Sequence, residues 1–420
     1  MANTFSKEER VAFDQVFEKF EDGLVISNLF NKYTLDDVTA ERTGNTIWRP
    51  QPYIAQVFTG IDQSANFNRN YTQLSVPTTL GYSFAVPLTL SATELRDQLQ
   101  EKRLGEAAMQ GLASQINVAC SNLAALTGTV FVKRTAAASG FDDIAACDDA
   151  FNRNGVPMGN RKAILASTHY NAMASNLAAS TRTFGNDISD PALRKAFVGD
   201  IAGFETYKAD YGYRLTAAAG SGITLNAANQ YYTPKATSVS ATGEVSNVDN
   251  RYQTITVNST TGVKAGDAFT LASVNEVHHI TKLDTGSSKT FRVVSVPSST
   301  TLVITPPIIS AGGGSDPEKQ YQNCSATPAS NAALTWLNTT SGLVNPFWQG
   351  DAFEIVPGNY RPVEDAGLAV LRATTANGVT VTMTRQGKIG DLSCQYRWDT
   401  FLGLVNKQPE MTGAEMFSQA

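Results

Sequence analysis

The chain has 420 residues, of which 42% are hydrophobic and only 17% charged, and its formal net charge is −5. This length suffices for two or three domains, and the acidic balance excludes an electrostatic wrap around nucleic acid. There is no run of 18 apolar residues, and the charged N-terminus lacks the apolar centre of a signal peptide. We therefore expect neither a membrane span nor a signal peptide, and a surface poor in charge that contacts neighbours.

The four cysteines are scattered along the chain without any C-x-x-C spacing: Cys120, Cys147, Cys324 and Cys394. This spacing argues against a zinc site and against a disulfide framework. We expect reduced thiols, as in a cytoplasm.

Residues 6–22 carry the signature of an amphipathic helix. Ser6 and Glu9 match a capping box, which favours a helix start. One apolar stripe follows at helical spacing: Phe13, Val16, Phe17, Phe20 and Leu24. The opposite face is acidic and carries Asp14, Glu18 and Glu21.

Residues 45–90 predict strands, because apolar residues alternate with smaller ones in "YSFAVPLTL" at 82–90. The middle of the segment, "GIDQSANFNRN", is polar and rich in turn residues. We interpret the whole as a long two-stranded loop that is too thin to hold a core of its own. Its apolar alternation would be explained if the loop lay over a neighbouring subunit.

Residues 91–127 give the strongest helix prediction in the chain. Ser91 and Glu94 match a second capping box, apolar residues keep helical spacing, and Gly128 is a plausible stop. Gly105 and Gly111 lie inside this long helix, where each costs roughly 1 kcal/mol relative to alanine.

The rest of the chain predicts an α/β region that a β module interrupts. Helix and strand signals mix over 128–221 and return over 343–420. Residues 222–342 are instead rich in Ser, Thr, Gly and Val, with short strand signals separated by turns, as in a β-sandwich or small barrel. Because this module interrupts an α/β domain, we expect its two ends to lie close together.

Candidate catalytic and metal-binding residues are few. The chain has three histidines, and the adjacent pair His278 and His279 would point to opposite faces of a strand, so we interpret this pair as part of a polar loop or strand end rather than as a metal site. We interpret the carboxylates around "CDD" at 147–149 as a solvated helix face. Common nucleophile, zinc and nucleotide-binding motifs are missing, so we expect no enzyme activity, no metal and no cofactor.

Several stretches together resemble the major capsid proteins of tailed bacteriophages. "GNTIWRP" (44–50) leads into the predicted loop, and "GDIAGFETYKAD" (199–210) resembles a recurrent capsid segment. "NVDNRYQTITVNSTTGVKAGDAFTL" (247–271) and "NPFWQGDAFEIVP" (345–357) look like the coat proteins of short-tailed phages with an inserted β-domain. The terminal "LSCQYRWDTFLGLVNKQPE" (392–410) is similar to the closing strand of such proteins.

The resemblance implies an α+β fold, the Hong Kong 97-type capsid fold with an inserted all-β domain. Its implied parts follow in chain order: an N-terminal arm (1–44), an extended loop or E-loop (45–90), the spine helix of the peripheral domain (91–127), the first part of the axial domain (128–221), the inserted β-domain (222–342) and the axial and peripheral return (343–420).

The function implied by the resemblance is that of a major capsid protein, which self-assembles as hexamers and pentamers of an icosahedral head enclosing double-stranded DNA. The implied partners are further copies of the chain, a scaffolding protein and a portal protein at one vertex. DNA would be enclosed without sequence-specific binding. The protein would be assembled in the bacterial cytoplasm into a precursor shell that expands on maturation, and would end in the virion. The alternative is a phage tail or surface protein whose β-domain binds host carbohydrate.

Three sets of residues are candidates for contacts or motions in such a shell. The acidic helix face of Asp14, Glu18 and Glu21 is a candidate dock for a basic scaffold helix. Gly105 and Gly111 mark a candidate bend of the spine helix between precursor and mature shells. Glu244, in the turn "SATGEV", is expected to project from the inserted domain as a contact loop. Because residues 45–90 contain no lysine, we expect no lysine–asparagine cross-links between subunits.

Overall fold

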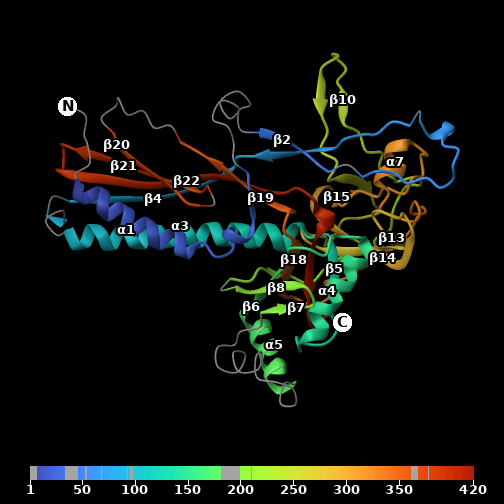
Figure 1. The fold of residues 1–420 in the computed structure, drawn as a ribbon, viewed down its shortest axis with the longest axis horizontal. Coiled ribbons are helices and arrows are strands. Elements are labelled where there is room, and N and C mark those ends of the chain that lie inside the picture. The colour runs from blue at the N-terminus through green and yellow to red at the C-terminus, as the bar shows by residue number, and fades with distance from the viewer. Residues whose placement is uncertain are drawn as a thin grey trace. The chain divides into compact units, whose positions relative to one another are not determined.

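The computed structural model describes residues 7–33, 46–52, 54–67, 69–91, 93–94, 98–180, 199–209, 211–360, 368–376 and 378–420. The chain divides into two compact units. Unit 1 contains residues 1–47, 78–121 and 353–405, and unit 2 contains 48–77, 122–352 and 406–420. Helices and strands occur in both units, so the predicted α+β class is confirmed (Figure 1).

Unit 1 is built on a mostly antiparallel sheet whose strands come from distant parts of the sequence. The sheet has the order β1-β19-β22-β21-β20, and β4 also pairs with β22. The strands are β1 (Asn31–Lys32), β4 (Tyr82–Leu90), β19 (Phe353–Gly358), β20 (Ala369–Thr374), β21 (Thr380–Lys388) and β22 (Ser393–Asn406). The alternation predicted for 82–90 is confirmed, because exposure alternates residue by residue along β4.

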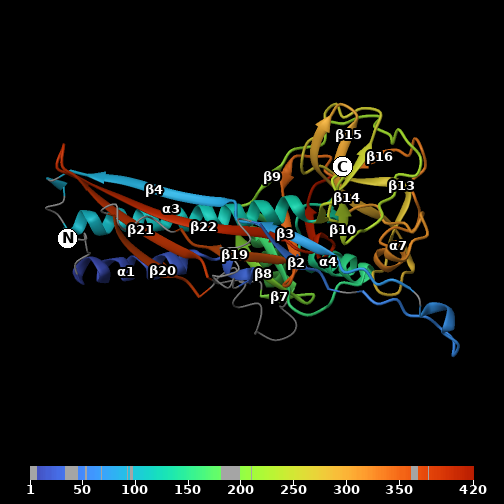
Figure 2. The same cartoon turned by 90° about the horizontal axis from the view of Figure 1, so that it is seen from above.

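Two helices run alongside this sheet, α1 (Lys7–Gly23) and the unit 1 part of α3 (Gln98–Thr127) (Figures 1 and 2). The predicted stripe of α1 is confirmed, since Phe13, Val16 and Phe20 are buried. Beyond α1 the chain turns through a 3₁₀ turn, Ser27–Leu29. The side-chain amide of Asn117 on α3 fixes that turn, because it donates to the Gly23 carbonyl and accepts from the Ile26 amide.

The predicted loop of residues 45–90 is two-stranded only at its base. There β2 (Thr46–Pro50) pairs with β3 (Ser75–Thr79). Between them the chain forms no further sheet within its described residues and makes one 3₁₀ turn, η2 (Ser64–Asn66). The third strand of the segment, β4, pairs with β22 over nine residue pairs instead of joining the loop.

The first part of unit 2 is an α/β layer. Its sheet has the order β5-β23-β18-β6-β8-β7. The strands are β5 (Val130–Lys133), β6 (Arg161–Ala166), β7 (Asp200–Ile201), β8 (Phe204–Ala209), β18 (Asn345–Gln349) and β23 (Thr412–Met416). Helices α4 (Phe141–Asn154) and α5 (Ser167–Ser180) accompany it, as the sequence predicts. The stretch "DPALRKAF" (190–197), whose sequence predicts a further short helix, lies outside the described residues.

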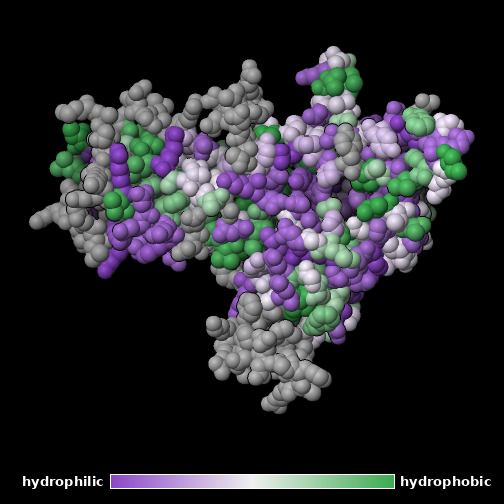
Figure 3. Space-filling view, viewed as in Figure 1, coloured by the Kyte–Doolittle hydropathy of each residue, from purple (hydrophilic) through white to green (hydrophobic). Residues whose placement is uncertain are grey.

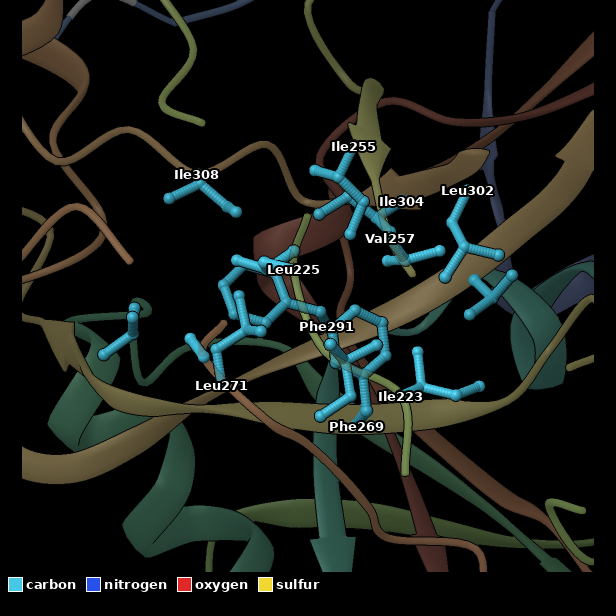
Figure 4. Packing of buried hydrophobic residues seen from close by; sticks show 14 of the residues in the cluster. Ile223, Leu225, Ile255, Val257, Phe269, Leu271, Phe291, Leu302, Ile304 and Ile308 are labelled. Atoms are coloured by element: carbon cyan, nitrogen blue, oxygen red, sulfur yellow. The ribbon is translucent and has the colours of Figure 1, made fainter. Parts of the chain in front are cut away.

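The second part of unit 2 is the β-domain. Its five-stranded sheet has the order β12-β15-β14-β13-β16, all antiparallel. The strands are β12 (Gln253–Thr256), β13 (Ala268–Val277), β14 (Asp284–Ser298), β15 (Thr301–Thr305) and β16 (Leu334–Trp336). Their inward side chains form a closed core with Ile223, Leu225 and Ile308 (Figure 4). The strand signals read from 222–342 are therefore confirmed.

Two further features of the β-domain concern its ends and its one helix. The chain enters through β9 (Arg214–Leu215) and leaves through β17 (Gly342–Leu343), and these two strands pair with each other. The expectation that the ends lie close together is thus confirmed. Unexpectedly, a short helix, α7 (Asp316–Tyr321), follows the glycine-rich turn at 311–315, with Ser315 as its N-cap.

Candidate assembly surfaces

The most exposed apolar side chains of the described chain include several on one extended segment, residues 51–74. Val57 and Phe67 are each 83% exposed, and Ile61 and Tyr71 are also exposed. The segment reaches away from the rest of unit 2 in Figure 2. Such a row of apolar groups has no role in the segment's own packing, and in a soluble protein it is typical of an interaction surface.

This extended segment is held to the β-domain near its C-terminal end. Leu74 packs with Ile309 and Tyr321, and the Tyr321 hydroxyl donates to the Thr72 carbonyl at 2.7 Å. The Asn70 amide donates to Asp316 Oδ2 at 3.2 Å. The unpredicted helix α7, which carries Asp316 and Tyr321, therefore serves as the dock for the base of the loop.

A hairpin of the β-domain forms the second surface. Strands β10 (Thr237–Val239) and β11 (Val245–Asn247) pair, and all six residues are exposed. The hairpin projects from its domain in Figure 1, and Figure 3 shows hydrophobic surface on this projection. The exposed cross-strand pair Val239 and Val245 supplies it. Glu244 lies in the turn, as expected, and its backbone amide donates a hydrogen bond to Ser240 Oγ at 3.1 Å.

The base of this hairpin is fixed by a residue that the sequence analysis missed. Asn250 is buried, and its Nδ2 donates to the carbonyls of Lys235 and Val248. Its Oδ1 accepts from the Lys235 amide and from the Tyr232 hydroxyl. All hydrogen-bonding capacity of this one amide is used to hold the two sides of the hairpin together. A two-stranded hairpin alone is marginal, so this anchor is needed for it to project in a defined direction.

The acidic face of α1 lies where the sequence places it. Asp14 and Glu18 are exposed, whereas the side chain of Glu21 lies outside what the structure describes. The neighbouring Lys19 pairs with Glu106 on α3 at 2.7 Å, and Lys102 donates to Gln15. Part of the polar side of α1 thus faces α3, and Asp14 and Glu18 are left on its solvent side.

The two glycines of α3 differ in their surroundings. Gly105 is buried, and a Cβ there would meet the Val16 methyl groups at 3.7 and 3.8 Å, an ordinary contact. Gly111 is exposed with nothing within 4 Å of such a Cβ. The structure assigns one uninterrupted helix from Gln98 to Thr127, so the bend remains a prediction about another state of the shell.

The carboxylates of α4 are not simply a solvated face, so that interpretation is wrong for two of them. Asp143 is buried, pairs with Arg134 at 2.9 Å and accepts from the amides of Ser139 and Gly140. Asp148 pairs with the buried Arg161. Sequence alone missed these pairs because both arginines lie outside the helix that carries the acids.

The histidine pair lies in a turn at the end of a strand, as the sequence analysis indicates, because β13 ends at Val277 and the Lys282 amide donates to the His278 carbonyl. His279 Nδ1 lies 4.0 Å from Glu410 Oε2. Burial lowers the pKa of His279 to about 4, although Glu410 acts against this shift. Within the described residues no group of three or more His, Cys, Asp or Glu side chains could hold a metal ion.

Glu410 also links the β-domain to the C-terminal segment of unit 2. It lies in the 3₁₀ turn η5 (Pro409–Met411) and pairs with Lys289 of β14, Nζ to Oε1, at 2.9 Å. Asn323 donates to the same oxygen at 2.8 Å. A pocket lined by these three residues and His279 adjoins the cluster.

These observations define a class of protein: an α+β chain with a long helix, an inserted β-domain and exposed apolar extensions, as in phage coat proteins. The chain belongs to the family described as P22 coat protein, gene protein 5, whose family model matches residues 1–418. It is therefore a coat protein of a tailed bacteriophage, with a structural, capsid-forming role in the virion. None of the helices in the described part is both long and apolar enough to cross a membrane.

Solved structures with similarity to the chain include capsid proteins of several phages. Mycobacterium phage Che8 gives a TM-score of 0.45 at 10% identity, covering 93% of this chain and 90% of that one. The mature capsid of bacteriophage PhiM1 gives 0.43 at 10% identity, covering 100% and 89%. The CUS-3 coat protein I-domain is 40% identical, covers 28% of this chain and 95% of that one, and has a TM-score of 0.22.

Proposed function

We propose that the chain is the major capsid protein of an icosahedral head and self-assembles as hexamers and pentamers around double-stranded DNA. Assembly in the host cytoplasm would pass through a scaffolded precursor shell that expands on maturation, with a portal protein at one vertex. The domain division by chain order given above, from the N-terminal arm to the axial and peripheral return, belongs to this proposal. Family membership supports the capsid role, and the proposal adds the architecture of the shell and the way in which it assembles.

The observation that carries the proposal is the extended segment 51–74. Four of its apolar side chains are exposed, Val57, Ile61, Phe67 and Tyr71, although its base is anchored by specific hydrogen bonds and a small apolar cluster. A segment anchored at its base and apolar along its length is suited to lie on a second copy of the same chain. Repetition of one such contact around a symmetric shell makes many weak contacts collectively strong.

The alternative, a carbohydrate-binding tail or surface protein, would require aromatic platforms in the loops of the β-domain. The segment 222–342 contains Tyr231, Tyr232 and Tyr252, and two of these tyrosines are engaged within the domain instead. Tyr232 donates its hydroxyl to Asn250, and Tyr252 lies beneath the guanidinium of Arg251, 5.1 Å from its ring centre. The structure therefore offers this alternative no support from those residues.

Electron microscopy of the chain expressed with and without its phage scaffold gene tests the proposal. We expect closed shells of uniform size with the scaffold, and aberrant or open assemblies without it. A soluble trimer under both conditions would contradict the proposal. Replacing Phe67 by Ser should reduce shell yield while leaving the circular dichroism of the unassembled chain unchanged.

The scaffold contact is tested separately with Asp14→Ala combined with Glu18→Ala. If a basic scaffold helix docks here, this variant should incorporate less scaffold. Raised salt should cause the same loss of scaffold in the wild type, because salt screens exposed charges beyond about 10 Å at 0.1 M. The matched control removes two exposed acids of α4, Asp142→Ala with Asp149→Ala. Equal scaffold content in the two double variants would refute the docking role of α1.

A further inference from the structure

Lys289, Glu410 and Asn323 form a compact group whose chemistry is not used by any assembly surface. The lysine ammonium and the asparagine amide both donate to Glu410 Oε1, at 2.9 and 2.8 Å. Lys289 is 4% exposed and Asn323 1% exposed. The Glu410 side chain retains 28% exposure, toward the pocket that adjoins the group. An amine, a carboxamide and a shared carboxylate are thereby held together in a largely dry environment.

The carboxamide of Asn323 is held by hydrogen bonds at both its oxygen and its nitrogen. Its Oδ1 accepts from the Ile309 amide at 3.0 Å, so a backbone donor faces the oxygen on which negative charge would develop. Its Nδ2 donates to the Pro307 carbonyl and to Glu410, which places the leaving nitrogen beside a proton carrier. These contacts also fix which end of the amide is oxygen and which is nitrogen.

We propose that Lys289 and Asn323 join in an intrachain isopeptide bond, with Glu410 carrying protons between them. The lysine ammonium first passes one proton to Glu410, and the neutral amine then attacks Cγ of Asn323. The Cγ–Nδ2 bond breaks as a second proton moves from the lysine nitrogen to Nδ2 through the carboxyl group. A secondary amide forms and ammonia leaves through the pocket, so the step needs no oxidant, reductant or second substrate.

The resting charges of Lys289 and Glu410 disfavour the neutral pair that reacts. Burial lowers the pKa of Lys289, but Glu410 more than offsets this, and the pKa of Lys289 is raised overall. Burial raises the pKa of Glu410, yet Lys289 and His279 hold it at about 2. The ion pair therefore dominates, and the neutral pair that reacts is a minor state. Nearby Lys282, whose pKa burial lowers to about 8, donates to the Gln322 backbone carbonyl instead of to Glu410.

The proposed bond is compatible with the expectation of no cross-links between subunits. Both residues belong to one chain, so the denatured coat protein would still run as a single band near its mass of 45.0 kDa. The bond would close a covalent ring between β14 and the segment that follows α7, within the β-domain.

Mass spectrometry of the purified full chain, incubated at 37 °C after folding, tests the proposal. We expect loss of one ammonia, about 17 Da, and a tryptic species in which residues 283–292 are joined to residues 320–372, because trypsin does not cleave the Arg361–Pro362 bond. Lys289→Arg, which keeps the cation, and Glu410→Gln should both abolish the joined species. The matched control Lys282→Arg should keep it.

The joined peptide decides the matter, since succinimide formation at Asn154–Gly155 also releases ammonia but does not link Lys289. Recovery of the peptides only as separate, unmodified species from wild-type protein would overturn the proposal. Because the presence or absence of the joined peptide is measured on the wild type, this test remains decisive even where a variant fails to fold.

Discussion

The β-domain and the extended segment 51–74 lie in the same unit and are both rich in apolar residues, yet they use these residues in opposite ways. In the β-domain, Phe269 and Phe291 are fully buried and stack with ring centres 5.7 Å apart. In the extended segment, Val57 and Phe67 remain 83% exposed. The first region satisfies its hydrophobic groups within one chain, whereas the second leaves them for a partner.

The difference separates the apolar groups that stabilise the folded chain from those that remain available for assembly. Burying one large apolar side chain is worth about 1.5–3 kcal/mol. The β-domain gains this energy when the chain folds, and the extended segment can gain it only when another surface covers it. Variants that exchange these roles should therefore separate defects of folding from defects of assembly.

The largest difference between the two regions is expected in the cooperative unfolding of each region expressed as an isolated fragment. A fragment of residues 222–342 contains the whole apolar cluster of the β-domain and should unfold cooperatively by circular dichroism. A fragment of residues 46–91 should show no cooperative transition. Because the first fragment lacks Glu410, Lys289→Met should raise its stability by removing a cation that has lost its partner. A fragment 222–342 without a transition would remove the basis of the comparison.

Single aromatic truncations should give the next largest effect. Phe269→Ala should cost about 3–5 kcal/mol of unfolding free energy, because it leaves a cavity in a closed core. Phe67→Ala in the extended segment should change that quantity by less than about 0.5 kcal/mol while lowering shell yield. Urea unfolding of the unassembled chain and microscopy of its assemblies measure the two quantities. Comparable stability losses in both variants would show that the extended segment is packed.

These two tests concern features that the sequence largely revealed. The stripe of α1, the alternation of β4 and the strand pattern of 222–342 are local periodicities, and the structure confirms them. Helix α7 was missed because "AGGGS" indicates a turn. Its last residue, Ser315, is also the N-cap of the helix and accepts a hydrogen bond from the Glu318 amide. Local patterns report which face of an element is buried, but not which element covers it.

No pattern in the sequence predicted the residues that hold distant segments of the chain together. Lys289 and Glu410 are 121 positions apart, and Asn323 and Glu410 are 87 apart. A lone lysine in a strand and a lone glutamate near the C-terminus are each typical of a solvated surface. Asp143 was misread for the same reason, since its partner Arg134 precedes the helix by several residues. Only the folded chain brings such charges together.

A buried acid in the α/β layer offers a test of how strictly a core excludes charge. Glu415 on β23 is 1% exposed, and neither carboxyl oxygen has a hydrogen-bond partner. Burial and then Asp143 raise its pKa well above its ordinary value of 4.5, although Arg134 and Cys147 act against this shift. The folded state therefore holds this proton more tightly than the unfolded state. Its stabilising effect is complete below pH 4.5 and is lost as pH rises through the raised pKa.

Glu415→Gln should accordingly raise the unfolding free energy at pH 8 by about 1–3 kcal/mol and flatten its dependence on pH. The exposed Glu244→Gln serves as the control and should leave that dependence unchanged. Thermal unfolding followed between pH 5 and pH 9 gives both curves. Parallel curves for wild type and Glu415→Gln would show that this carboxyl group does not titrate with folding.

The smallest effect is expected in α3. Gly111→Ala adds a methyl group in open space and should stabilise the helix by up to about 1 kcal/mol. Gly105→Ala should gain less, since its new Cβ must pack against Val16. If the helix bends when the shell expands, the double variant should also slow expansion, measured by light scattering of heated precursor shells. Unchanged expansion in the double variant would contradict a bend of α3 between the precursor and mature shells.

The pairing of β9 with β17 has a consequence for what the coat chain can carry. The host chain leaves and resumes its path at one hydrogen-bonded point, Leu215 opposite Gly342. A folded domain whose own termini lie equally close could be joined to the host chain at this point. Such an exchange would keep the entry and exit of the chain, but it would remove the contacts by which Tyr321 and Lys289 hold segment 51–74 and Glu410.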